Sequence, residues 1–417
     1  MSVPLDRLYN FLHDISDRAL FIYRWTPYGS KKLADFLRLL PSIKSHWLDR
    51  TIPVAICHDQ EPLYYELYTE SDIRDQILSY LATMPENDIT ERLWIQSLID
   101  FLSKMHLRGL VYLNHMGIYD KIMILHSEKR SHQLQIYEEN EYVGIYYWSH
   151  AMISADWFRY AQHDSKLILN FDQIRYDFLI YNRAWTGTRE YRLTFMHELI
   201  NRDLQKNCLT SFSSHDDGFD YLDHKFKNST LAVDLQGLAD HFPINTHDST
   251  ASADYNNDDY SCTAIEVVLE TLFDDPRLHL TEKTLRPIAC GRPFMLMATH
   301  GSLQYLKDYG FRTFDGIIDE TYDTITDPRK RLNAVVQEMV RISSLNRSEK
   351  YILWTQLYDI AKFNQRLFFS EDWQQSISQE FLTNLYRAIG VLNQHKNKVI
   401  QNKMDQIWDK VLESKSL

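Results

Sequence analysis

Short apolar runs alternate with amphipathic stretches along most of this chain. In the first half the apolar runs are Ala19–Tyr23, Ile52–Cys57, Gly109–Asn114 and Lys121–His126. The stretches with apolar residues at helical spacing are 30–40, 71–83, 91–105 and 149–162. Short apolar runs suit buried strands, and strands that alternate with helices are typical of βαβ units. We therefore expect a mostly parallel sheet in this half.

The second half repeats the alternation. Its expected strands are Asp177–Tyr181, Cys208–Phe212, Cys262–Leu269 and Phe294–Ala298. Its expected helices are Thr188–Arg202, Leu303–Tyr309 and Pro328–Ser343, followed by a helical pattern over 346–417. Residues 213–260 are rich in Asp, Ser, His and Asn, which predicts a long loop or a mobile lid.

The length of 417 residues exceeds one ordinary hydrophobic core, so two domains are expected. The restart of the pattern places the boundary near residues 165–175. We predict two α/β domains over 1–170 and 171–345, and a helical segment over 346–417 that packs back on them.

Charge and cysteine spacing limit the classes of function. The formal net charge of −12 argues against non-specific nucleic-acid binding over the whole surface, but 45 Lys and Arg residues leave room for a local basic cleft. No apolar run approaches the ~20 residues of a membrane span, so we expect no membrane insertion. The absence of a signal-peptide pattern and of CxxC pairs among Cys57, Cys208, Cys262 and Cys290 predicts a cytoplasmic protein with reduced thiols and no zinc site.

The segment Thr281–Phe314 has the succession of helix, turn and strand that forms a ligand crevice at the edge of a parallel sheet. Glu282 and Lys283 open a short helix, a turn follows at Gly291–Arg292–Pro293, and an apolar strand leads into a second turn. Lys283 is suited to a phosphate group and Glu282 to a hydroxyl group. The alternative interpretation is a surface ion pair at a helix that Thr281 caps.

Three arginines follow the strand that ends at Tyr181. Arg183 stands at the carboxyl end of this strand, where open α/β sheets place ligands. Arg189 and Arg192 are three positions apart and would share one face of the next helix. Arginine binds phosphate through planar bidentate contacts. The alternative is that Arg189 and Arg192 pair with acidic residues on a solvated helix.

Acidic residues also follow the strand that ends at Cys57, in the sequence HDQEPLYYE. Asp59 or Glu61 is placed to deprotonate an acceptor hydroxyl, and His58 is a weaker candidate. The alternative is a turn that Pro62 fixes. The sequence does not decide between the two carboxylates.

The turn at His300–Gly301–Ser302 is a further candidate. Backbone amides at Gly301 and Ser302 are predicted to receive a phosphate oxygen. The acidic stretches 216–220 and 254–259 are candidates for a divalent metal ion, but solvated loops are the favoured interpretation, so we expect no metal ion.

The segment TEKTLRPIACGRPFMLMATHGSLQYLKDYGFRTF resembles the donor-binding signature of nucleotide-sugar glycosyltransferases with the GT-B architecture. The resemblance implies two facing Rossmann-like domains, with the donor nucleotide on the second. It implies that a carboxylate, Glu266 or Glu282, binds the ribose hydroxyls, and that Lys283 and Arg183 neutralise the diphosphate. It implies no cofactor beyond the donor substrate, which we expect to be UDP-linked.

The fucosyltransferase group has a comparable pattern, but this chain departs from it at Arg292–Pro293–Phe294, so neither fucose nor a guanine nucleotide is implied. The segment, together with DQEPL, is most similar to glycosyltransferase-like proteins of tailed bacteriophages. This implies a hexosyl- or pentosyltransferase of the host cytoplasm that modifies 5-hydroxymethylcytosine in phage DNA. Candidate DNA contacts are the basic segments Lys31–Lys32, Lys129–Arg130 and Lys225–Lys227 and the aromatic residues Trp148, Trp157 and Trp185. The favoured alternatives are ordinary solvated patches for the basic segments and core packing for each tryptophan.

The sequence is compatible with two other functions. The same chemistry on a cell-surface glycan or a protein is one alternative. A non-catalytic nucleotide- or sugar-binding protein on the same scaffold is the other.

Overall fold

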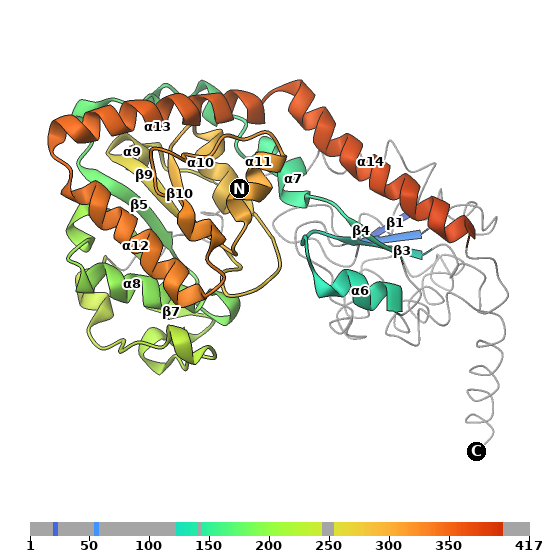
Figure 1. The fold of residues 1–417 in the computed structure, drawn as a ribbon, viewed down its shortest axis with the longest axis horizontal. Coiled ribbons are helices and arrows are strands. Elements are labelled where there is room, and N and C mark those ends of the chain that lie inside the picture. Colours follow the sequence, from blue (N-terminus) through green and yellow to red (C-terminus); the bar gives the residue numbers. More distant parts are fainter. Residues whose placement is uncertain (1–19, 24–53, 58–121, 140–142, 244–253, 395–417) are drawn as a thin grey trace, which may run out of the picture. The chain divides into compact units, whose positions relative to one another are not determined.

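The computed structural model describes residues 20–23, 54–57, 122–139, 143–243 and 254–394. Contacts divide the chain into two compact units. The β5–β10 unit is His150–Ile377, and the β1–β4 unit is Ser2–Ser149 with Ser378–Leu417. Each unit contains a parallel sheet with helices, so the α/β class is confirmed (Figure 1).

The sheet of the β1–β4 unit contains β1 (Leu20–Tyr23), β2 (Val54–Cys57), β3 (Ile122–His126) and β4 (Val143–Tyr146). All its described strands are parallel, in the order β1-β2-β3-β4. The first three were predicted. The predicted elements between 58 and 121, and the helix at 30–40, lie outside the described residues.

One helix and one strand of this unit were not predicted. Helix α6 (His132–Glu139) has the sequence HQLQIYEE, whose few apolar residues give a weak helical period. Strand β4 is only four residues long and contains Gly144, which strand patterns disfavour. The Leu134 and Tyr137 side chains lie against Gly144, so α6 packs where a glycine allows close approach.

The sheet of the β5–β10 unit positions the candidate site. Its strands are β5 (Tyr176–Asn182), β6 (Cys208–Phe212), β9 (Thr263–Leu269) and β10 (Phe294–Met297). They are parallel, in the order β10-β9-β5-β6. Strand β6 lies on one side of β5. The next strands of this sheet along the chain, β9 and then β10, lie on the other side of β5. The strand order therefore reverses between β5 and β9, which is where open α/β sheets bind ligands.

Helices cover both faces of this sheet. Helices α8 (Tyr191–Asn201) and α12 (Pro328–Ser344) lie together on one face, and α10 (Glu282–Ala289) and α13 (Arg347–Phe368) lie together on the other (Figure 1). Every residue of β9 is buried as a result. Parallel strands covered on both faces have continuous apolar sequences, which is why these strands were predicted.

Several helix starts of the described residues follow the expected capping rules. The Asp327 carboxylate accepts a hydrogen bond from the Lys330 amide, and Pro328 opens α12. Asn346 and Glu349 form a capping box at the start of α13. The helical pattern of the tail is confirmed as far as the end of α14 (Glu371–Gln394), and residues 395–417 lie outside the described ranges.

Two predicted helices are shorter than expected. Helix α7 is Ser149–Trp157, and short 3-10 turns follow it. The helix expected from Thr188 begins at Tyr191, after a 3-10 turn at Gly187–Arg189. This 3-10 turn opens with Gly187, whose φ of +66° lies in the left-handed region that favours glycine.

The division into units lies earlier in the chain than the boundary predicted near 165–175. It falls between Ser149 and His150, because α7 packs with the β5–β10 unit. His150 lies beside Glu282, and the Arg292 guanidinium donates to the Leu167 carbonyl. The division crosses α14 between Ile377 and Ser378, so the tail contributes to both units.

The segment predicted as a loop or lid is packed where it is described. It contains a small hairpin of β7 (His215–Asp216) and β8 (Phe219–Asp220), followed by 3-10 turns. The rings of Tyr221 and Phe242 both contact Phe212 of β6. Residues 213–243 therefore cover the edge of the sheet, and 244–253 lie outside the described residues.

Among the helices of the described ranges, none is long and apolar enough to cross a membrane.

Candidate functional site

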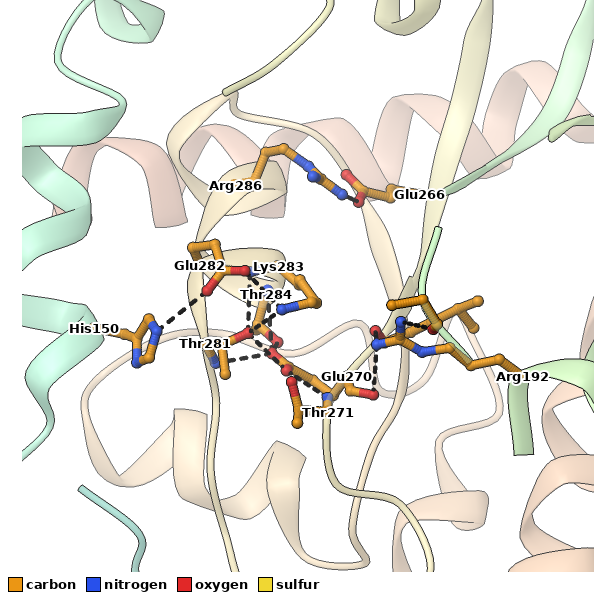
Figure 2. A network of polar contacts seen from close by, with 12 residues as sticks. His150, Arg192, Glu266, Glu270, Thr271, Thr281, Glu282, Lys283, Thr284 and Arg286 are labelled. Atoms are coloured by element: carbon orange, nitrogen blue, oxygen red, sulfur yellow. Dashed lines mark hydrogen bonds and ion pairs between the residues drawn. The ribbon is translucent and has the colours of Figure 1, made fainter. Parts of the chain in front are cut away.

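Glu270 organises the carboxyl end of β9 (Figure 2). This carboxylate is fully buried and accepts hydrogen bonds from the backbone amides of Thr271 (3.1 Å), Thr281 (2.9 Å) and Thr284 (3.3 Å). It also accepts from the hydroxyls of Thr281 at 2.8 Å and Thr284 at 2.5 Å. Glu270 thereby ties the first turn of α10 to the end of β9.

The amides at the start of α10 are occupied by groups of the protein. Thr281 is the N-cap, and its hydroxyl accepts from the Lys283 amide at 3.3 Å, as the sequence predicted. The Thr281 and Thr284 amides donate to Glu270. A ligand anion at this helix must therefore bind side chains rather than these three backbone amides.

Glu282 and Lys283 form an ion pair at this point. The Lys283 ammonium lies 2.6 Å from Oε1 of Glu282 and 3.3 Å from the Thr281 hydroxyl. The other oxygen of Glu282, Oε2, lies 3.2 Å from Nε2 of His150 (Figure 2). Burial alone would raise the pKa of Glu282, but the Lys283 charge and the His150 contact hold that pKa well below its usual range.

Lys283 retains access to solvent. Its side chain is 22% exposed, whereas that of Glu282 is 9% exposed. An ammonium group has three donors, and two polar partners of Lys283 are found among the described residues. This leaves one donor of Lys283 for a ligand at the carboxyl edge of the sheet.

Arg192 joins the two strand ends at the point where the strand order reverses. Its buried guanidinium donates to the carbonyls of Ala184 at 2.6 Å, Leu269 at 2.5 Å and Glu270 at 2.9 Å. The hydroxyl of Tyr191 adds a hydrogen bond of 2.7 Å to the Glu270 carbonyl. Arg192 is thus part of the framework that holds the ends of β5 and β9 together.

Arg183 lies in the loop that follows β5, as predicted. Arg189 lies in the same loop, although the sequence predicted it in the next helix, and both side chains are half-buried. Arg189 does not share a helix face with Arg192, because it belongs to the 3-10 turn before α8. Its Nε donates to the Thr186 carbonyl at 3.2 Å. The loop thus brings two cations to the carboxyl side of β5.

The same loop surrounds the carboxylate of Asp216. Oδ2 of Asp216 accepts from the amides of Trp185 and Thr186, each at 2.7 Å, and from the Thr186 hydroxyl at 2.8 Å. Burial alone would raise the pKa of Asp216, but these hydrogen bonds and the nearby Arg189 lower it overall. An internal carboxylate therefore occupies the amides of this loop.

Glu266 is placed differently from Glu282. It lies in the middle of β9, where its Oε1 is 2.5 Å from Nη2 of Arg286 and its Oε2 accepts from the Tyr260 hydroxyl. Glu266 is buried, and both of its carboxylate oxygens are used within the protein. This geometry favours a structural role over the predicted contact with ribose.

Gly301 and Ser302 begin helix α11 (Ser302–Asp308), as expected, and Gly301 has a φ of +82°. The Gly301 amide donates to the Asp323 carbonyl at 2.8 Å, and the Leu303 amide donates to the Asp323 carboxylate at 3.1 Å. The Ser302 hydroxyl donates to the Thr299 carbonyl at 2.6 Å. A phosphate at this turn would have to displace Asp323, which the sequence pattern did not reveal.

Other predicted contacts divide into three groups. Asp59, Glu61 and Lys31–Lys32 lie outside the described residues. Trp148, Trp157 and Trp185 are buried in the core and do not offer a stacking surface. Lys225 and Lys227 are exposed, as is Arg130, whereas the Lys129 ammonium lies 5.4 Å from the centroid of the Tyr146 ring.

His150 is the member of the site that the sequence did not indicate. It comes from α7, distant in the chain from α10, and no local pattern links the two positions. Its ring also contacts His279 edge-on, with 5.2 Å between centroids. A single buried histidine carries no sequence signal for such a contact.

Within the described ranges, no group of three or more His, Cys, Asp or Glu side chains is placed to hold a metal ion. Compared with protein-family models and with curated proteins, the sequence matches none of them. The arrangement itself presents a buried carboxylate framework and one partly exposed ammonium at the carboxyl edge of a parallel sheet. Such an edge is suited to an anionic ligand.

Proposed function

We propose that the protein is a nucleotide-sugar glycosyltransferase of the GT-B type. In this proposal the β5–β10 unit binds the donor, and Lys283 contacts its diphosphate. The observation that carries the proposal is the partly exposed Lys283 ammonium, held on Glu282 at the start of α10, which Glu270 ties to the carboxyl end of β9. The strand order reverses between β9 and β5. Ligands of open α/β sheets bind at such positions.

Sugar transfer from a nucleotide donor is favoured by a cation beside the departing diphosphate. An acceptor hydroxyl forms a bond to the anomeric carbon of the sugar while the bond from that carbon to the diphosphate oxygen breaks. The nucleoside diphosphate leaves with the bonding electron pair, and the hydroxyl proton passes to a base. A fixed ammonium near the leaving oxygens stabilises the developing negative charge. Lys283 has this role, Arg183 is its proposed second cation, and Asp59 or Glu61 is the proposed base.

The proposed acceptor is 5-hydroxymethylcytosine in DNA. The support for it is the resemblance of Thr281–Phe314 and DQEPL to phage proteins. A base within a duplex must be extruded before its substituent can react, or must be reached in a single strand. With Trp148, Trp157 and Trp185 buried, stacking on the extruded base would fall to other aromatic residues.

A transfer screen tests the proposal. UDP-, GDP- and CMP-linked sugars are incubated with the protein and with DNA that contains either 5-hydroxymethylcytosine or cytosine, and the digested nucleosides are weighed by mass spectrometry. A gain of one hexose or pentose on the hydroxymethylated base alone supports both donor and acceptor. Nucleotide binding or release without such a gain contradicts the DNA acceptor and directs the search to glycans, proteins or a non-catalytic role. No response to any nucleotide contradicts the glycosyltransferase proposal.

A further inference from the structure

The two carboxylate oxygens of Glu282 contact two different side chains. Oε1 contacts Lys283 at 2.6 Å, and Oε2 lies 3.2 Å from Nε2 of His150. The His150 side chain is 3% exposed and that of Glu282 is 9% exposed. Their contact is therefore shielded from water, where a charge-assisted hydrogen bond is strong.

The contact joins two different helices. His150 is the second residue of α7, and Glu282 is the first residue of α10. A glutamate side chain has three rotatable bonds, so a partner on only one oxygen leaves it several orientations. The second partner removes this freedom, and the oxygen that holds Lys283 then points in one direction.

We propose that His150 is a positioning residue of the donor site, which fixes Glu282 so that the Lys283 ammonium is held toward the bound diphosphate. This inference rests on the proposed function, because it assigns a role to His150 in that same site. His150 itself touches no reacting atom. Its effect is transmitted through one carboxylate to one ammonium.

A second histidine–glutamate contact in the same unit provides the matched comparison. Nε2 of His224 lies 3.3 Å from Oε2 of Glu190, with side chains 11% and 3% exposed. Glu190 binds the amides of Lys227 and Asn228 rather than a lysine ammonium. The two contacts are alike in distance and burial, and only that of His150 leads to a partly exposed cation.

The first test compares kcat and KM for the donor in His150→Ala, His150→Gln and His224→Ala. A misplaced catalytic group costs on the order of 10²-fold in rate, so we expect kcat of His150→Ala to fall by roughly 10- to 100-fold. KM for the donor should change less. In His150→Gln the amide NH₂ still donates to Glu282, so most of the rate should return, and His224→Ala should keep it. Equal kcat in His150→Ala and wild type, or equal losses in the Ala and Gln variants, would overturn the role.

The second test does not depend on activity. Lys283 is labelled with an amine-reactive ester, and its labelling rate is measured by peptide mass spectrometry. Loss of His150 should release Glu282 and expose Lys283, so labelling in His150→Ala should rise several-fold, while His150→Gln and His224→Ala should match wild type. An unchanged rate in His150→Ala would overturn the inference. If wild-type protein shows no transfer and no response to any nucleotide while this labelling still rises, the proposed function fails and the positioning contact stands.

Discussion

Two acid–base pairs hold helix α10, and they differ in what surrounds them. Glu266 and Arg286 lie 2.5 Å apart with side chains 1% and 5% exposed, and Glu266 also binds the Tyr260 hydroxyl. Glu282 and Lys283 lie 2.6 Å apart, and the Lys283 side chain is 22% exposed. Distance and charge are the same in both pairs. The two pairs differ in the exposure of the cation. Only the pair with the partly exposed cation can contact a ligand.

The comparison extends to the amide groups at the carboxyl edge of the sheet. Glu270 occupies amides at the start of α10, Asp216 occupies those after β5, and Asp323 occupies those at the start of α11. Each of these positions suits an anion, and each is filled by a carboxylate of the protein itself. Recognition of a ligand anion at these positions therefore falls to exposed side chains, Lys283 first.

The largest change in stability is expected from breaking the enclosed pair. Glu266→Ala leaves the Arg286 guanidinium buried without its partner, which should cost about 3–5 kcal/mol in the free energy of unfolding. Urea denaturation measures it. Replacing Glu266 and Arg286 together by Leu and Met should recover most of this loss, because no buried charge remains. If Glu266→Ala unfolds at the wild-type urea concentration, the pair does not have the structural role given to it.

A smaller loss is expected at the internal cap of α11. Asp323→Ala removes the carboxylate that binds the Leu303 amide, and loss of such a cap costs about 0.5–2 kcal/mol. Asp323→Asn keeps an acceptor oxygen and should lose less. Thermal unfolding of the two variants provides the comparison. A greater loss in the Asn variant than in the Ala variant would argue against a capping role.

The smallest effect concerns acid pH and Glu282. Lys283 and His150 hold the pKa of Glu282 well below its usual range despite burial, so the ionised form stabilises the fold. This contribution is complete above the unfolded-state pKa of about 4.3 and is lost as pH falls through the lower folded-state pKa. The difference in unfolding free energy between wild type and Glu282→Gln should be constant from pH 6 to about pH 5 and shrink below about pH 4. Urea denaturation across this range measures it, and parallel stability curves down to the most acid point would contradict it.

The sequence was sufficient for the four strands of the β5–β10 sheet and for the location of Lys283 at the opening of α10. Buried parallel strands have continuous apolar sequences, such as TAIEVVL in β9, and Thr281 is a residue type that caps helices. Strand β4 escaped prediction because VGIY is short and contains a glycine. These successes and the missed strand all depend on residues that are neighbours in the sequence. A hydrophobic pattern contains only this local information.

The partners of the site residues could not be predicted, because they come from distant parts of the chain. Nothing near Glu282 in sequence indicates His150, and nothing near Gly301 indicates that Asp323 fills the turn. Glu266 and Glu282 are equally acidic in the sequence. Only packing makes one of them an enclosed partner of Arg286 and the other a support for Lys283.

The most direct test of the account is the transfer rate of Lys283→Ala at saturating donor. Lys350→Ala is its matched control, because Lys350 forms an ion pair of similar length, 2.8 Å, with Asp177 near the opposite end of β5. Loss of one group that stabilises a developing charge costs roughly 10²- to 10³-fold in kcat. We expect such a loss for Lys283→Ala, which should remain folded by circular dichroism, and near wild-type kcat for Lys350→Ala. Wild-type kcat in Lys283→Ala would contradict the account.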